Sequence, residues 1–411
     1  MARVVITGMG AVSPVGNDAP TMWSNVVAGK SGVARITAFD PSDLETHIAA
    51  EVKGFDAAAL LGPKVARTTD RFIQLALAAA IEAVTDSGLS LDRANTERIA
   101  VVVGTGVGGM STMIQQLHVL DEKGPRRVSP FFIPMILPDS AAAQIAIHFG
   151  IHGPNLAITS ACATGTNVVG EAAELVRCGR VDKAICGASE ASILRLALAA
   201  FNAMGAISKR NDDPAGACRP FEANRDGMVM GEGAGIMVLE RLDDAKARGA
   251  RIYAEIIGYG LSADAFHIAA PLEDGSGAVI ALRQALASAG LGLSDVDYVN
   301  AHGTGTRLND RAETLAIKTV FGQEAYKLAI SSTKSVSGHL LGAAGAIEAI
   351  ITAKAVHEGV MPPTINYVTP DPECDLDYIP NQARRADVRV AISNSFGFGG
   401  HNATVAFRRY A

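Results

Sequence analysis

A weak internal repeat constrains the fold more than any other feature of this sequence. Three segments of the first half have counterparts in the same order in the second half: VITGMG (Val5–Gly10) with EIIGYG (Glu255–Gly260), VVVGTGV (Val101–Val107) with VNAHGTGT (Val299–Thr306), and AITSAC (Ala157–Cys162) with AISNSF (Ala391–Phe396). The pairs predict two similar α/β halves, 1–250 and 251–411, which meet near residues 245–255. No linker rich in Pro, Gly or Ser separates the halves, so we expect one compact unit. The alternative, that strand-turn-helix corners simply look alike, stays open at this point.

Apolar β-branched runs alternate with alanine-rich helical segments. The runs that predict buried strands are Arg3–Thr7, Ile99–Val103, Leu156–Thr159 and Lys183–Ile185. Residues 71–87 and 167–177 carry apolar side chains at spacings of three and four, which is typical of amphipathic helices. The pattern predicts an α/β fold with a parallel or mixed sheet covered on both faces.

Composition excludes several classes of function. The formal charge of −6 argues against a nucleic-acid partner or an anionic membrane surface for the chain as a whole. Five cysteines without a CxxC pair favour neither a disulfide framework nor a zinc site. No uncharged apolar stretch of about 18 residues predicts a membrane span, and the N-terminus enters a strand-like run at once, so we expect no signal or transit peptide. These features predict a cytoplasmic protein.

Cys162 is a candidate nucleophile. It follows the run NLAITSA and precedes a predicted helix that ends at the glycine Gly179. A thiol at such a corner lies next to a helix N-terminus, whose unpaired amides and dipole favour the thiolate and lower its pKa. The alternative is a buried, inert cysteine, which is the commonest fate of free Cys. The other cysteines have no comparable setting, and we interpret them as structural.

Two histidines in the opposite half also lie at glycine-rich corners. His302 ends a strand in VDYVNAHGTGT, and His339 lies in SSTKSVSGHLLGAAGAIEAI, where Gly338 is expected to open an apolar helix. In the first turn of that helix the dipole would keep the His339 imidazole neutral and able to donate a hydrogen bond. Lys334 precedes it by five residues, and Glu348 follows along the helix. We interpret the remaining histidines, including His267, as structural.

The segment SNSFGFGGHNATVAF near the C-terminus combines glycines with two aromatic residues. Gly397, Gly399 and Gly400 allow a loop to approach a ligand closely. Phe396 and Phe398 would form an apolar wall or gate beside it.

Taken together, these motifs resemble the β-ketoacyl-(acyl carrier protein) synthases, specifically the elongating KAS I/II type and most closely KAS II. The resemblance covers nearly the whole chain through VVITGMGAVSPVGN, GPRRVSPFFIP, SACATG, RPFEANRDGMVMGEGAGIMVLE, NAHGTGT, STKSVSGHLLGAAGAIE and NSFGFGGHN, in the order of the family. It implies a thiolase-like five-layered αβαβα fold built from two similar halves. It further implies elongation of a Cys-bound fatty acyl group by two carbons from malonyl-acyl carrier protein, without a metal or organic cofactor.

The roles of the family's residues carry over to matching positions. The implied catalytic residues are Cys162 as nucleophile, His302 and His339 on the malonyl thioester, Lys334 and Glu348 supporting them, and Phe398, whose backbone amide joins that of Cys162 in the oxyanion hole. The implied substrate-binding residues are Thr304 and Thr306 on the pantetheine arm, Val107 and Phe201 in the acyl pocket, and Phe396 beside the gate.

The resemblance also implies partners. It predicts a homodimer that binds the acidic acyl carrier protein through a basic rim, matched here by Lys64, Arg67, Arg126, Arg127 and Lys209. Ordinary solvated surface is the alternative interpretation of these charges. The sequence departs from the family at Arg307, where Pro is frequent, and at Ala270, where Ser or Thr precedes Pro. The second departure puts one contact with the pantetheine arm in doubt.

Three rival functions remain open. A degradative thiolase would be expected to carry a second cysteine near the C-terminal glycine loop, whereas Cys374 lies in an acidic segment. A non-catalytic chain-length factor would lack the nucleophile. A ketosynthase of a polyketide pathway performs the same chemistry on other substrates, and the sequence does not separate it from a fatty acid enzyme.

Overall fold

The computed structural model describes residues 1–91 and 96–410. Its main sheet contains two runs of strands with the same order and the same directions. The first run is β5 (Asn155–Leu156), β4 (Ile99–Gly104), β6 (Lys183–Glu190), β7 (Gly233–Arg241) and β1 (Val4–Val12). The second run, position for position, is β10 (Ala329–Ser331), β9 (Tyr298–Asn300), β13 (Val390–Gly397), β14 (His401–Arg408) and β8 (Ala254–Ala263). In each run the first three strands are parallel. The fourth strand pairs antiparallel with both the third and the fifth.

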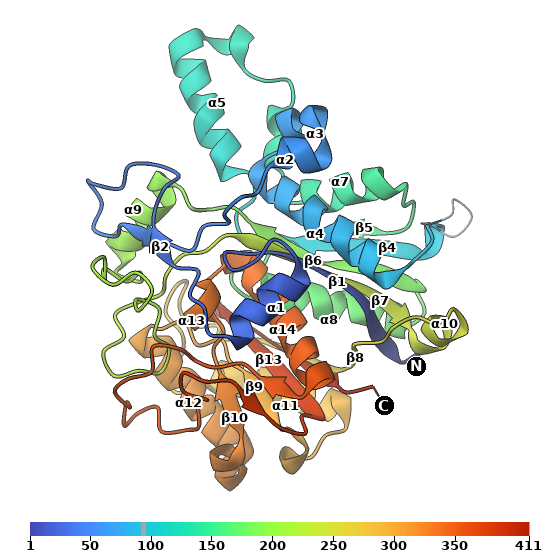
Figure 1. Ribbon diagram of the computed structural model, residues 1–411, viewed down its shortest axis with the longest axis vertical. Coiled ribbons are helices and arrows are strands. Elements are labelled where there is room, and N and C mark those ends of the chain that lie inside the picture. Colours follow the sequence, from blue (N-terminus) through green and yellow to red (C-terminus); the bar gives the residue numbers. More distant parts are fainter. Residues whose placement is uncertain (92–95, 411) are drawn as a thin grey trace.

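The two runs join where β1 and β8 pair antiparallel over a short stretch, from Val4 opposite Ile256 to Ile6 opposite Ala254. Helices divide the molecule into layers, as Figure 1 shows. The covering helices are α4 (Arg71–Ser87) and α7 (Ser140–Phe149) outside the first run, α8 (Thr164–Arg177) and α14 (Ala344–Glu358) between the runs, and α11 (Ser276–Ala289) and α12 (Arg307–Phe321) outside the second. The predicted α/β, thiolase-like fold of two similar halves is confirmed.

Local sequence accounts for these helices. The side chain of Asp70 accepts a hydrogen bond from the Phe72 amide at the start of α4, and Gly88 ends that helix in the left-handed conformation. The two central helices approach closely because they meet at glycines. A Cβ on Gly165 would lie 2.3 Å from the Ala346 nitrogen. This contact brings the N-termini of α8 and α14 together, and with them the loops that precede both helices.

Apolar side chains form one large cluster in each space between a sheet and its helices. The central cluster combines residues of both halves, such as Val168 of α8 and Ile347 of α14, whereas the outer clusters surround α4 and α11. The core therefore fixes the two halves against each other. Within the described residues, no helix is both long enough and apolar enough to cross a membrane.

Two details of the sequence interpretation are wrong. The predicted buried strand at residues 156–159 is instead the short edge strand β5, whose residues are exposed. The third repeat pair does not join equivalent elements, because residues 391–396 belong to β13, whose counterpart is β6 rather than the segment after β5. The division at residues 250 and 251 falls between α10 (Leu242–Ala247) and β8, and it stays a prediction.

Candidate active site

Cys162 lies at the corner between β5 and α8. The preceding residue, Ala161, has a φ of 50°, an unfavourable conformation for a residue with a side chain. The corner is held by Thr164, whose hydroxyl accepts from the Ser160 amide, and by Asn167, whose amide donates to the Ser160 hydroxyl. The predicted corner before a helix is confirmed, and strain is concentrated directly before the thiol.

The predicted low pKa of this thiol is wrong. Burial raises the pKa of Cys162 to about 11, although the Lys334 charge and the backbone amide of Phe398 act in the opposite direction. The sequence argument considered the helix end and overlooked the loss of water around a side chain that is only 8% exposed. The resting side chain is therefore the neutral thiol.

The C-terminal glycine loop lies directly against this corner. A Cβ on Gly397 would lie 2.9 Å from the Ser160 carbonyl oxygen and 3.0 Å from the Cys162 nitrogen, so only glycine fits there without displacement. The next residue, Phe398, directs its backbone amide at the thiol, as does Cys162 itself. Two amides therefore converge beside the sulfur, which is the arrangement an oxyanion hole requires.

His302 lies at the end of β9, and its loop is held by a buried carboxylate. The amides of His302 and Gly303 donate to the two oxygens of Glu313 on α12, at 2.9 and 2.8 Å. The Ser332 hydroxyl donates to the Gly303 carbonyl oxygen from the other side. The imidazole therefore projects from a loop that is anchored on both sides.

His339 does not lie where the sequence predicted. The short helix α13 (Lys334–Ser337) ends before Gly338, and α14 begins only at Ala344, so His339 belongs to the connection between them. Its ring nitrogen Nδ1 accepts from the Leu341 amide at 3.2 Å. Because Nδ1 accepts, a neutral ring carries its proton on Nε2 and can donate from that atom.

The two imidazoles meet edge to face, with their centroids 5.3 Å apart. Burial, and next the positive charge of Lys334, lower the pKa of both His302 and His339 well below the ordinary value. The predicted neutral state of His339 is correct, but burial and Lys334 are its causes, rather than a helix dipole. Both rings are hydrogen-bond donors that remain uncharged near neutral pH.

Lys334 and Glu348 form a buried ion pair beneath these rings, with Nζ and Oε1 2.5 Å apart. Burial raises the pKa of Glu348 to about 7, and Lys334 acts against that rise. The pair links the corner after β10 to helix α14, and so fixes the connection that carries His339.

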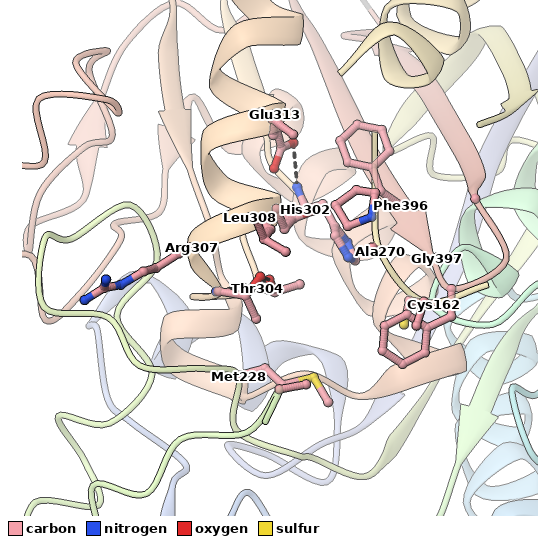
Figure 2. A pocket seen from close by; sticks show the side chains of 18 of the residues that line it. Cys162, Met228, Ala270, His302, Thr304, Arg307, Leu308, Glu313, Phe396 and Gly397 are labelled. Carbon is pink, nitrogen blue, oxygen red and sulfur yellow. Dashed lines mark hydrogen bonds between the residues drawn. The ribbon is translucent and has the colours of Figure 1, made fainter. Parts of the chain in front are cut away.

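A cavity of about 470 Å³ brings most of the predicted catalytic and substrate-binding residues together. Cys162, His302, His339, Thr304, Thr306, Phe396 and Phe398 all line it. Figure 2 shows Cys162 and Gly397 on one side of this pocket, Thr304 near its middle and Arg307 on the opposite side. Ala270, the noted departure from the family, also contributes to the lining.

Two predicted substrate-binding residues lie outside this lining. Phe201 stacks against Phe398, with ring centroids 6.3 Å apart, but is not among the residues that line the cavity. Val107 is exposed and also lies outside the lining.

The predicted docking residues are exposed on several short elements. Lys64 and Arg67 lie on α3 (Pro63–Thr68), and Arg126 and Arg127 on a single helical turn. Lys209 forms an ion pair with Glu45, so its charge is partly neutralised.

The sequence interpretation missed several functional positions. Asp310 and Glu313 on α12 are buried carboxylates that bind the amides of Gly305 and of the His302 loop. A signal was present, since both share a helix face with the apolar Ile317. His267, interpreted as structural, lines the cavity, and its Nδ1 accepts from two backbone amides.

Comparison with known proteins agrees with this geometry. Residues 1–245 match the family model of the beta-ketoacyl synthase N-terminal domain, and residues 253–368 match that of the C-terminal domain. The chain belongs to the beta-ketoacyl synthase family.

Members of this family are similar to the chain over its full length. It is 51% identical over 408 residues to 3-oxoacyl-(acyl-carrier-protein) synthase 2 of Staphylococcus aureus (strain COL), covering 99% of this chain and 98% of that protein. The protein of the same description from Synechocystis sp. is 49% identical, with the same coverage. A type II PKS ketosynthase, solved in complex with its acyl carrier protein, superimposes with a TM-score of 0.93 at 35% identity over 100% of both chains.

Proposed function

We propose that this beta-ketoacyl synthase is a 3-oxoacyl-acyl carrier protein synthase of the KAS II type. It condenses a fatty acyl group on Cys162 with malonyl-acyl carrier protein and releases 3-oxoacyl-acyl carrier protein, CO2 and free carrier. The observation that carries the proposal is one cavity in which Cys162 meets two neutral imidazoles and two convergent backbone amides. The 49–51% identity to proteins described as 3-oxoacyl-acyl carrier protein synthase 2 supports this choice of subtype.

The first step is acyl transfer. The sulfur of Cys162 attacks the acyl thioester carbonyl, whose oxygen accepts from the amides of Cys162 and Phe398 while it carries negative charge. The carrier sulfur leaves and takes up the proton that the thiol gives up, so bonds and charges balance. Since burial raises the pKa of Cys162 to about 11, this proton transfer has to accompany the attack.

The second step is decarboxylation and condensation. Cleavage of the malonyl carboxylate releases CO2 and leaves an enolate, whose oxygen accepts hydrogen bonds from His302 and His339. The enolate carbon then attacks the acyl carbonyl, and the cysteine sulfur leaves as a thiolate, which takes a proton from water to restore the thiol. Neutral imidazoles suit this task, because the donors must stabilise the enolate without protonating it. Lys334 and Glu348 hold the connection that carries His339, and burial together with the Lys334 charge keeps both histidines neutral.

The proposal is tested by mixing the protein with acyl-acyl carrier protein in the absence of malonyl donor. Intact and peptide masses are expected to show an acyl adduct on the Cys162 peptide. Malonyl-acyl carrier protein should then release it as the 3-oxoacyl product. A protein that forms no adduct with any chain length is not a synthase, and a non-catalytic partner subunit would then be the better interpretation.

Alternative functions fit the site less well. A degradative thiolase would need a second cysteine at the cavity, whereas Cys374 is buried outside its lining and lies beside Arg225. A chain-length factor would not need the assembled nucleophile and histidines. A polyketide ketosynthase shares the chemistry, and the product formed from repeated additions of malonyl-acyl carrier protein distinguishes it, since a fatty acid enzyme stops after one condensation.

Exposed apolar side chains support the further proposal of a homodimer. Leu117 on α5 (Met110–Lys123) is 55% exposed and Ile147 on α7 is 73% exposed, and α7 packs against β5, which is an edge strand of the main sheet. In Figure 1, α5 projects from the body of the molecule. Light scattering should give twice the chain mass for the native protein and a lower mass for Leu117→Glu, with Leu293→Glu as the control. The location in the cytoplasm rests on the five free cysteines, which suit a reducing compartment.

The predicted carrier rim is part of the same proposal. Lys64, Arg67, Arg126, Arg127 and Lys209 would bind the acidic carrier protein. Charge reversal at Arg67 should weaken carrier binding mainly at low salt, because exposed charges are screened as ionic strength rises.

A further inference from the structure

Several polar residues of the cavity lie on one short stretch of chain. His302, Thr304, Thr306 and Arg307 all line the cavity, and the hydroxyls of Thr304 and Thr306 share a hydrogen bond of 2.9 Å. Arg307 begins α12 and is exposed. In Figure 2 its side chain extends away from Cys162, on the far side of Thr304. The stretch therefore runs from the reacting end of the cavity to its outer end.

Among the described residues, Arg307 is the charged lining residue whose side chain has no hydrogen-bond or ion-pair partner. Each other charged group of the lining has its own partners: Arg225 pairs with Asp310 and Asp371, Asp226 accepts from Ser208, Asp264 accepts from Asn402, and Glu313 binds the His302 loop. The Arg307 guanidinium has no hydrogen bond or ion pair with any residue in the described ranges 1–91 and 96–410. Asp371, whose pKa the Arg307 charge lowers, is already bonded to Arg225.

The loop that carries Ala270 offers no replacement for this charge. Ala269 and Ala270 line the cavity but have no side-chain donor, and their backbone amides donate to Nδ1 of His267. The loop at Ala269 and Ala270 therefore adds apolar lining, and the free guanidinium of Arg307 is the charge available to a ligand. A guanidinium in this setting fits a phosphate, which it binds through paired N–H donors.

We propose that Arg307 binds the phosphate of the carrier's phosphopantetheine arm and makes the site selective for phosphorylated thioesters. The inference deepens the proposed function and rests on it. A phosphopantetheine thioester has its reacting sulfur at one end and its phosphate at the other. With the sulfur at Cys162 and the arm along Thr304 and Thr306, the phosphate lies toward Arg307.

Two ligands that differ only in the phosphate test this assignment, S-hexanoyl phosphopantetheine and S-hexanoyl pantetheine. Binding is measured by calorimetry on the full-length Cys162→Ala protein, which cannot react with either ligand. The phosphate should strengthen binding about tenfold, the effect of a partly exposed charge-assisted hydrogen bond. That preference should fall to nearly 1 when Arg307→Met is added, and Arg307→Lys should restore much of it.

The matched control is Arg283→Met, which removes an exposed arginine of α11 outside the lining and should leave the preference unchanged. Two results would overturn the assignment. One is equal binding of the two ligands to Cys162→Ala with Arg307 intact, and the other is an undiminished preference for the phosphorylated ligand after Arg307→Met is added. Failure of the proposed function is a separate result. In that case the protein with Cys162 intact would form no acyl adduct, while the Cys162→Ala protein still bound the phosphorylated ligand more tightly.

Discussion

The two halves of the molecule use the same corners for different chemistry. After β5 the first half continues through Cys162 into α8, and after β10 the second half continues through Lys334 and His339 into α14. After β4 the chain turns at Thr105, and after β9 it turns at His302. The fold thus supplies two pairs of equivalent corners around one cavity. In the proposed function, one half carries the nucleophile and the other carries the histidine hydrogen-bond donors.

The difference arises from the lengths of the connections. Seven residues, 157–163, separate β5 from α8, whereas twelve residues, 332–343, separate β10 from α14. The short connection strains Ala161 and holds Cys162 beside its helix. The longer one contains α13 and the turn at His339, and it is stabilised by the buried ion pair between Lys334 and Glu348. The repeated fold therefore provides equivalent positions, and the different lengths of the connections give them different geometry.

The largest expected effects come from substituting Cys162 in the first half and His302 in the second, because each substitution should block a different step of the reaction. Cys162→Ala should abolish the acyl adduct, because no other group in the cavity is placed to accept the acyl chain. His302→Ala should still form the adduct but slow CO2 release from malonyl-acyl carrier protein by about 10²–10³-fold, the usual cost of losing one oxyanion donor. Adduct mass and CO2 release are measured on both variants. Loss of the adduct in His302→Ala would contradict this division of labour.

The next prediction concerns the contact between the halves at the nucleophile. Gly397→Ala would place a Cβ 2.9 Å from the Ser160 carbonyl oxygen and 3.0 Å from the Cys162 nitrogen. The displacement needed should misplace the Phe398 amide and lower kcat for condensation by about 100-fold, as roughly 1 Å errors in position do. Gly292→Ala serves as the control, since its nearest neighbour is the carboxylate end of Asp295. An unchanged kcat would mean that the glycine loop moves freely.

The sequence predicted the positions of Cys162 and His302 at strand ends better than it predicted the environment of the site residues. Cys162 and His302 were found because glycines and polar residues interrupt apolar runs at the ends of strands, and this pattern is local. His339 was assigned to the wrong element, because Gly338 ends one helix without beginning the next. The pKa of Cys162 was predicted in the wrong direction, because burial depends on segments far apart in sequence, such as the glycine loop at Gly397. Family resemblance, rather than residue patterns, supplied the roles of Lys334 and Glu348.

A smaller effect is expected from the carboxylates that hold the equivalent corners. Glu313 accepts from the amides of His302 and Gly303, and Glu190 accepts from those of Gly106 and Gly342. Glu313→Gln turns one acceptor into a donor and should cost about 1–3 kcal/mol of stability. It should slow CO2 release about tenfold while the acyl adduct forms normally. Glu190→Gln is the matched variant in the other half, and an identical kinetic profile for the two would contradict their separate roles.

The smallest expected effect is a pH dependence of stability caused by the buried histidines. The pKa of His302 is held well below 6.5 in the folded protein, so below pH 6.5 the unfolded chain binds the additional proton. The contribution of His302 to the unfolding free energy therefore decreases as the pH falls through 6.5. The raised pKa values of Glu82, Glu313 and Glu348, each about 7, act in the opposite direction, because their contribution is lost as the pH rises toward 7.

Comparison of the native protein with His302→Asn isolates the contribution of the histidine. The difference in unfolding free energy should shift in favour of the variant by about 1.4 kcal/mol per pH unit below 6.5. Urea unfolding between about pH 5.5 and 7.5 measures it, with the exposed His118→Asn as control. A constant difference across this range would mean that His302 takes up its proton at the same pH in the folded protein as in the unfolded chain. Below about pH 6.5 the second half would then present a charged donor to the enolate, and the contrast with the neutral thiol of the first half would have a different chemical basis.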